Sequence, residues 1–150
     1  MINEVLHIGM TVSDLEQSKK FYGDVLGFKF VGQIEMQGTE SDILFGRKNV
    51  RAKVAYMNGS DKLMAPPVEL IQFMDVDSKK EEMSLFKTSI SELCFRVDDI
   101  EETYNELKNK GVEFLSKPCY MDFRKDGLGE SKAVYMKDPD GIILELMQVL

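Results

Sequence analysis

The sequence has few of the residues that build disulfide frameworks and zinc ribbons. Its 150 residues include two cysteines, one histidine and no tryptophan. Two isolated cysteines exclude a disulfide framework or a zinc ribbon as the organising feature. Cys94 lies in an apolar run and is expected to be a small core residue, whereas Cys119, beside Pro118 and Tyr120, is expected in a loop.

Basic residues are outnumbered by acidic ones, and long apolar runs are absent. The 19 lysines and arginines face 26 acidic residues, which gives a formal net charge of −7 without a long basic run. This balance argues against nucleic acid or an anionic membrane surface as the main partner. No apolar stretch approaches the roughly 20 residues of a membrane-spanning helix, and the N-terminus does not resemble a signal peptide. We therefore expect a cytoplasmic protein that contacts neither nucleic acid nor membrane.

The composition is that of a globular protein. Hydrophobic residues make up 43% of the chain and charged residues 30%. A chain of this length and composition can bury one substantial core, so one compact domain, residues 1–150, is expected.

An internal repeat is the most informative feature of the chain. His7–Glu16 is echoed by Glu92–Glu101, and Val68–Gln72 is echoed by Leu144–Gln148. So many matches are an unlikely product of coincidence, and they indicate a duplicated module. The repeat divides the chain into a first module of about residues 1–75, a linker of about 76–87 and a second module of about 88–150.

Each half predicts the same order of elements. Residues 5–12 predict a strand, Ser13 and Glu16 form a capping box that starts a helix, and Gly27 ends this helix. In the second half a strand at 93–97 precedes a helix capped by Asp98 or Asp99 and ended by Gly111. Three further strands follow in each half: 28–34, 52–57 and 68–73, then 112–115, 132–136 and 142–148.

The connections carry turn signals. Asn58-Gly59 and Asp140-Gly141 favour tight hairpin turns because glycine adopts a positive φ without strain. The charged segment 75–87 is predicted to be a surface linker with room for a short helix. Residues 116–131, which include Pro118 and two glycines, predict a long loop that could fold over a pocket.

Strand alternation places four acidic or imidazole side chains on one face of the predicted sheet. Successive side chains on a strand point to opposite faces. The more apolar set suits the side that meets the helix, which leaves His7, Glu69, Glu92 and Glu145 on the opposite side. Arg47, Arg51, Arg96 and Arg124 are candidates for holding an anionic substrate group or for pairing with acidic side chains.

Three segments resemble the vicinal oxygen chelate superfamily. They are His7–Phe28, Phe95–Glu101 and Asp138–Leu146. This superfamily includes glyoxalase I, methylmalonyl-CoA epimerase, extradiol dioxygenases and the fosfomycin and bleomycin resistance proteins. The resemblance implies an α+β fold in which two tandem βαβββ modules form a curved mixed sheet around a concave cleft. It also implies a homodimer, since members of the superfamily commonly pair.

The resemblance further implies a divalent metal ion held by the first and last strands of each module. By position, its ligands would be His7, Glu69, Glu92 and Glu145. Glu92 departs from the glyoxalase pattern, in which a histidine is more typical, and it could instead turn to solvent. One imidazole and three carboxylates around a divalent ion sum to −1, and this oxygen-rich set favours Mn²⁺, Mg²⁺ or Fe²⁺, with Ni²⁺, Co²⁺ or Zn²⁺ possible through His7.

The activity implied by the resemblance is that of a glyoxalase-like lyase or isomerase. The metal would bind two neighbouring oxygens of a small-molecule substrate and stabilise an enediolate, while Glu145, or else Glu69, moves a proton between adjacent carbons. Three alternatives remain: a metal-free binding or antibiotic-resistance protein, a methylmalonyl-CoA epimerase-like enzyme, and a transferase resembling the fosfomycin enzymes. Extradiol ring cleavage is disfavoured, because its iron site resembles two histidines and a carboxylate.

Overall fold

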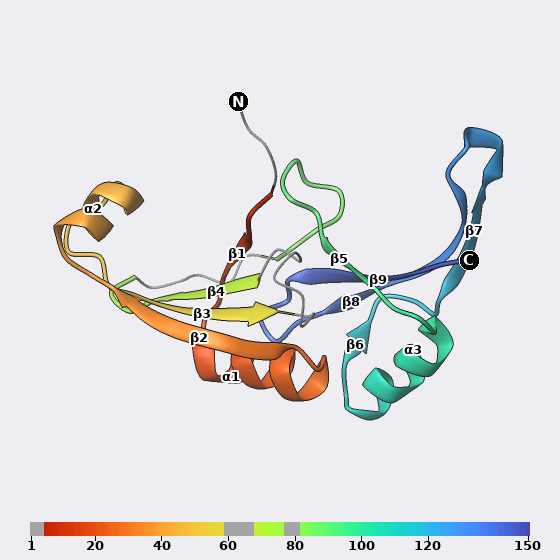
Figure 1. Ribbon diagram of the computed structural model, residues 1–150, viewed down its shortest axis with the longest axis horizontal. Coiled ribbons are helices and arrows are strands. Elements are labelled where there is room, and N and C mark those ends of the chain that lie inside the picture. Colours follow the sequence, from red (N-terminus) through yellow and green to blue (C-terminus); the bar gives the residue numbers. More distant parts are fainter. Residues whose placement is uncertain (1–4, 59–67, 77–81) are drawn as a thin grey trace. The chain divides into compact units, whose positions relative to one another are not determined.

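The computed structural model describes residues 5–58, 68–76 and 82–150 (Figure 1). The chain divides into two compact units, Met1–Lys80 and Glu81–Leu150. Their boundary falls inside the segment expected to link the two modules. The described part of that segment, 75–76 and 82–87, contains no helix. That the two units form one domain stays a prediction.

The first unit is a four-stranded sheet with a helix on one face. Its elements are β1 (Ile8–Thr11), α1 (Leu15–Lys20), a π-helical turn (Phe21–Val25), β2 (Lys29–Met36), α2 (Thr39–Phe45), β3 (Ala52–Asn58) and β4 (Val68–Phe73). The strand order is β1-β4-β3-β2, with β1 parallel to β4 and the other pairs antiparallel. Sequence reasoning missed α2.

The second unit repeats this arrangement with an additional strand. Its elements are β5 (Leu93–Arg96), α3 (Ile100–Asn109), β6 (Glu113–Phe114), β7 (Cys119–Phe123), a 3₁₀ turn (Arg124–Asp126), β8 (Gly129–Lys137) and β9 (Ile143–Val149). The order is β5-β9-β8-β6, β7 also pairs with β8, and β5 lies parallel to β9. The predicted α+β class and the tandem βαβββ modules are confirmed.

Helices α1 and α3 each follow an N-cap aspartate. The Asp14 carboxylate accepts the backbone N–H of Gln17 at 3.0 Å, and the Asp99 carboxylate accepts those of Glu101 and Glu102. The predicted Ser13 cap is therefore wrong, because Asp14 is the extended residue that precedes the helix. Among the described residues, no helix combines the length and apolar character needed to cross a bilayer.

The core of each unit lies between the sheet and its helix. Helix α1 contacts β3 and β4, and α3 contacts β9. The following side chains of the helices and strands are buried: Leu15, Tyr22, Ala55, Met57 and Leu70 in the first unit, and Ile100, Tyr104, Leu107, Met136 and Leu144 in the second. The apolar strand positions therefore face the helix, as alternation predicts, and the opposite face of each sheet is left for the site.

The connections differ in part from the prediction. Residues 116–131 are a hairpin of β7 and β8 rather than a long loop, since Cys119–Phe123 pairs with residues 129–133. Gly127, with φ +76°, belongs to the hairpin turn. The Asp140-Gly141 turn is confirmed: the Asp138 carboxylate accepts two backbone N–H groups there, and Gly141 has φ +84°. Gly59 of the other predicted turn lies outside the described residues.

Candidate functional site

His7 and Glu69 meet in the first unit. Nε2 of His7 lies 3.2 Å from Oε2 of Glu69, and the Glu69 side chain is only 12% exposed. His7 directly precedes β1, and Glu69 lies on β4 opposite Gly9. Alternation thus brings these two predicted site residues to one face of the sheet. Their role as metal ligands stays a prediction.

Tyr56 completes this part of the site. It lies on β3 directly opposite Glu69, on the same face of the sheet. Burial raises the pKa of Tyr56, and the charge of Glu69 and a hydrogen bond with its carboxylate raise it further. A phenol with a raised pKa keeps its proton, so Tyr56 donates and the Glu69 carboxylate accepts.

Gly9 leaves space beside the Glu69 carboxylate. A Cβ added at Gly9 would lie 3.8 Å from Oε2 of Glu69 and 3.2 Å from Cδ1 of Ile71. The second distance is tighter than an ordinary contact. A β-carbon at this position would therefore make an ordinary contact with the carboxylate, and Ile71 would have to shift by a few tenths of an ångström.

Glu145 occupies the equivalent position in the second unit. It lies on β9, is only 8% exposed, and stands between Cys94 on β5 and Tyr135 on β8. Cys94 is exposed, so its predicted place in the core is wrong. It sits on the site-bearing face because strand alternation, rather than its apolar neighbours, decides which way it points.

The Cys94 thiol is nevertheless partly desolvated. This desolvation, together with a hydrogen bond to Glu145 and the charges of Glu145 and Glu92, raises the pKa of Cys94 to about 12. The thiol therefore stays protonated near neutral pH and acts as a weak donor to Glu145. Burial, followed by the charges of Glu145, Glu92 and Cys94, also raises the pKa of Tyr135.

Glu92 belongs to the same neighbourhood. It directly precedes β5, it is half-buried, and the hydroxyl of Ser91 donates to its Oε2. Its charge acts on both Cys94 and Tyr135. The structure therefore places Glu92 near the Glu145 row and does not leave it fully in solvent.

The two units carry equivalent rows of residues. Gly9, Glu69 and Tyr56 form one row across β1, β4 and β3, and Cys94, Glu145 and Tyr135 form the other across β5, β9 and β8. Sequence reasoning missed both tyrosines. The signal was present, since Lys53-Val-Ala-Tyr-Met57 and Lys132-Ala-Val-Tyr-Met136 are near repeats.

The His7 nitrogen and the Glu69 oxygen lie at the distance of an ordinary ion pair or hydrogen bond. An imidazole and a carboxylate are ligand types that divalent ions accept. Within the described ranges, no group of three or more histidine, cysteine or acidic side chains is arranged to hold a metal ion. Each unit therefore presents a partial set of ligands.

Two of the four candidate arginines pair with acidic side chains. Arg51 forms a two-point ion pair with Asp75, with both N–O distances at 2.9 Å. Arg124 pairs with Asp122 at 2.9 and 2.6 Å. Each carboxylate neutralises its guanidinium, which weakens the hypothesis that Arg51 or Arg124 holds an anionic substrate.

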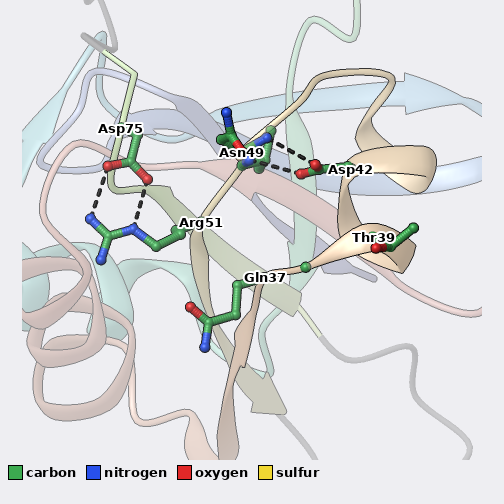
Figure 2. Close-up of a pocket in the computed structure, with 8 residues that line it drawn as sticks. Gln37, Thr39, Asp42, Asn49, Arg51 and Asp75 are labelled. Atoms are coloured by element: carbon green, nitrogen blue, oxygen red, sulfur yellow. Dashed lines mark hydrogen bonds and ion pairs between the residues drawn. The ribbon is translucent and has the colours of Figure 1, made fainter.

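The Arg51–Asp75 pair lines a cavity of about 810 Å³ in the first unit (Figure 2). Asp42, another lining residue, accepts the backbone N–H groups of Asn49 and Val50 at 2.9 Å each. The charged side chains of this cavity thus already form hydrogen bonds or an ion pair within the protein. The cavity includes none of the four predicted ligands, and we assign it no catalytic role.

The fold and the equivalent rows define a protein of two βαβββ modules, each with a glutamate on its last strand. Residues 4–146 match the model of the glyoxalase/bleomycin resistance protein/dioxygenase superfamily. The chain belongs to this superfamily, and the predicted membership is confirmed.

Two relatives illustrate how far the likeness extends. The virulence protein STM3117 of Salmonella typhimurium is 24% identical over 149 residues, which cover 99% of this chain and 85% of that protein. A probable lactoylglutathione lyase of Synechocystis is 25% identical over 144 residues, which cover 96% of this chain and 94% of that protein.

Solved structures share the fold. A glyoxalase family protein from Bacillus cereus is 19% identical, with a TM-score of 0.80 and coverage of 99% of this chain and 97% of that one. The trypanothione-dependent glyoxalase I of Leishmania major is 20% identical, with a TM-score of 0.69 and coverage of 98% and 87%. At these identities the likeness shows the fold, and the activity must be argued from the site.

Proposed function

We propose that the protein is a metal-dependent lyase or isomerase of the glyoxalase-like type, acting on a small oxygenated substrate. One observation carries the proposal: the equivalent strands β4 and β9 each bring a largely buried glutamate opposite a tyrosine. A buried carboxylate is costly unless it is paired or binds a cation. The probable lactoylglutathione lyases among the relatives support the reaction class.

The proposed ligands are His7, Glu69, Glu92 and Glu145. When bound, a divalent ion would polarise neighbouring oxygens of the substrate and stabilise negative charge that develops on them. With one nitrogen and three carboxylates, the set favours Mn²⁺, Mg²⁺ or Fe²⁺, while the imidazole keeps Ni²⁺, Co²⁺ and Zn²⁺ possible.

Glu145 is the first choice for the residue that moves the proton. Its carboxylate accepts from a thiol, which is a weak donor, whereas Glu69 contacts an imidazole and accepts from a phenol. Glu145 is therefore less firmly held, and it is screened from bulk water by its burial. Glu69 is the second choice.

Metal binding tests the site. We expect the purified parent chain to bind one divalent ion, and His7→Ala and Glu145→Gln to weaken that binding at least about tenfold. Glu113→Gln is the control, because it removes an exposed carboxylate that pairs with Lys137. Variants that bind metal like the parent would refute the site. A parent chain that binds no divalent ion would refute the proposal and favour a metal-free binding protein.

Proton transfer tests the reaction. In D₂O, we expect the metal-loaded parent to exchange the hydrogen on the carbon beside a carbonyl in a suitable substrate, and Glu145→Gln to lose this exchange. NMR spectroscopy over a broad panel of small 2-hydroxy carbonyl compounds provides the measurement. No metal-dependent exchange with any member of the panel would contradict the proposed reaction.

A homodimer and a cytoplasmic location also stay predictions. Strand β2 exposes large apolar side chains, with Phe30 53% and Val31 63% exposed, and a second copy could cover them. Light scattering at several concentrations tests the dimer, and cell fractionation tests the location.

A further inference from the structure

A second row of side chains lies beside the Glu145 row on the same face of the second unit. Arg96 on β5 stands opposite Met147 on β9, which stands opposite Ala133 on β8. Each of the three is two residues along its strand from a member of the Glu145 row. Residues two apart on a strand share a face, so the second row continues the site-bearing face.

Beyond this row the site-bearing face stays apolar. Its large side chains come from the two strands that flank β8, and they form an apolar strip: Met147 and Val149 on β9, and Met121 and Phe123 on β7. Val149 is 64% exposed and Phe123 is 42% exposed, while the two methionines are half-buried. Phe123 stands opposite Gly129, four residues along β8 from Ala133. At about 3.3 Å per residue, the strip is about 13 Å long.

The opposite face of the same hairpin is polar. Tyr120 and Asp122 alternate with the strip residues of β7, and they stand opposite Lys132 and Glu130. Tyr120 donates to Glu130, and Lys132 pairs at 3.0 Å with Glu101 of α3. The end of the hairpin extends away from α3 (Figure 1). Packing against this helix therefore does not account for the apolar strip, which lies on the other face.

Arg96 is a cation on the site-bearing face. It is exposed, and among the described residues no carboxylate lies within ion-pair distance of it. Arg51 and Arg124, by contrast, each pair with an aspartate. The backbone of Arg96 lies one strand across and two residues along from Glu145, which is a separation of about 8 Å. A guanidinium beside an apolar strip suits an anionic group on an otherwise apolar molecule.

We propose that the substrate is a carboxylate with an oxygen on the neighbouring carbon and an apolar chain, such as a 2-hydroxy acid of medium chain length. This inference rests on the proposed function, whose substrate it names, and it needs residues of the second unit alone. Arg96 binds the carboxylate, the oxygenated carbon lies at the Glu145 row, and the chain lies along the apolar strip. Charge complementarity at Arg96 and continuity with the Glu145 row favour this ligand over a second protein chain.

Binding of 2-hydroxy acids of increasing chain length tests the strip. We expect the purified chain, in the presence of EDTA, to bind 2-hydroxyoctanoate more tightly than lactate. The affinity should rise by up to about fourfold for each added CH₂, because each one leaves water for the strip. Isothermal titration calorimetry measures this series.

Met121→Gln and Tyr120→Gln are a matched pair, because they are neighbours on β7 that point to opposite faces. Met121→Gln should weaken binding of 2-hydroxyoctanoate about three- to tenfold and leave that of lactate unchanged. Tyr120→Gln should bind both compounds like the parent. Equal effects of the two variants would count against the strip as the binding surface.

The charge of Arg96 is tested with a neutral analogue. The parent should bind 2-hydroxyoctanoate about tenfold more tightly than 2-hydroxyoctanamide, since hydrogen bonds to a charged group are stronger. Arg96→Met should lose this preference and bind the amide like the parent. Lys132→Met is the control, because it removes a cation from the opposite face of the same sheet. A preference that survives in Arg96→Met would overturn the role of Arg96.

The outcomes distinguish failure of the substrate class from failure of the proposed reaction. An affinity that does not change with chain length, or no binding of 2-hydroxyoctanoate, overturns the substrate class even where shorter compounds exchange hydrogen. Binding that depends on chain length, without any metal-dependent exchange, refutes the reaction and leaves the binding surface in place. If light scattering shows that Met121→Gln dissociates an oligomer while ligand binding is unchanged, a second copy covers the strip and the substrate class is wrong.

Discussion

Cys94 and Glu145 show how one neighbour controls the chemistry of a side chain. An exposed cysteine is normally a candidate for a reactive thiol, yet partial burial and the adjacent carboxylate raise the pKa of Cys94 to about 12. Only the thiolate is strongly nucleophilic. Cys94 is therefore expected to be inert near neutral pH despite its exposure.

Removal of the Glu145 charge should restore the reactivity of Cys94. In a Cys119→Ser background without metal, Glu145→Gln removes a negative charge that opposes thiolate formation, so the pKa of Cys94 should fall. The rate of alkylation by iodoacetamide at pH 8.5 should rise roughly tenfold for each unit of that fall. Mass spectrometry measures the rate, and Glu113→Gln serves as the control. An unchanged rate in Glu145→Gln would show that Glu145 does not govern the thiol.

At this scale the sequence predicted part of the candidate site. The repeat placed His7 and Glu69 on one face, and the structure brings them to 3.2 Å. The sequence did not reveal the tyrosines, and the apolar neighbours of Cys94 wrongly suggested a core position, although strand alternation places Cys94 on the same face as Glu92. The reason is physical: contacts across neighbouring strands depend on register, and the register of β3 against β4 emerges only when the whole sheet forms.

At the scale of secondary structure, a glutamine on the last strand of each unit is hydrogen-bonded to the start of α1 or α3. The Gln72 side chain on β4 accepts the backbone N–H of Leu15 at 3.2 Å and donates to the carbonyl of Ser13 at 2.9 Å. Gln148 on β9 accepts the backbone N–H of Ile100 at 3.1 Å. These bonds attach the start of each helix to the strand that carries the proposed metal ligand.

Gln72→Ala should therefore destabilise the protein. It leaves two partly buried backbone groups without their partner, at a cost of about 1–3 kcal/mol in the free energy of unfolding. Urea denaturation measures this change. The matched control is Gln17→Ala, an exposed position on α1, which should change stability by less than about 0.5 kcal/mol. Equal effects of the two variants would contradict the bridging role of Gln72.

The ion pair between Arg51 and Asp75 joins the segments that flank β3 and β4. A hydrogen bond from Arg51, followed by the attraction of its charge, lowers the pKa of Asp75 in the folded state. The stabilising contribution of this carboxylate is thus complete above the ordinary aspartate pKa near 3.9, and it is lost as the pH falls through the lower folded-state value.

Asp75→Asn should lower the thermal midpoint at pH 7, and the difference from the parent should shrink as the pH falls below about 4. The pair is exposed, so 1 M NaCl should also reduce the difference. Thermal unfolding between pH 2.5 and pH 7 provides the measurement. A difference that stays constant over this range would rule out the ion pair as its cause.

The fold was easier to predict than these details. Hydrophobic alternation and the glycines after the helices predicted both βαβββ modules. Strands and helices that bury one face repeat their apolar residues with periods of about 2.0 and 3.6 residues, and these periods can be read from the sequence. Helix α2 was missed because it is short and lies between two glycines, and strand β7 because it is short and lies in a segment with a proline and two glycines. Their stability comes from tertiary contacts, such as the packing of Phe45 on Phe73, rather than from their own sequence pattern.

At the scale of the whole molecule, the proposal makes both modules contribute to one ion. Saturating metal should then raise the thermal stability of the parent, by about 2.7 kcal/mol at a free concentration 100 times the dissociation constant. His7→Ala in one module and Glu145→Gln in the other should each remove about half of this gain or more at the same metal concentration, as expected for a dissociation constant raised at least about tenfold. Calorimetry with and without EDTA measures it. Retention of half the bound metal in each variant would instead indicate two independent sites.

The space at Gly9 limits which side chains can stand at positions 9 and 71 together. The second half carries Cys94 and Met147 at the corresponding positions. A β-carbon at position 9 would press against Ile71 at 3.2 Å. A larger residue at position 9 therefore requires a smaller or more flexible side chain at position 71.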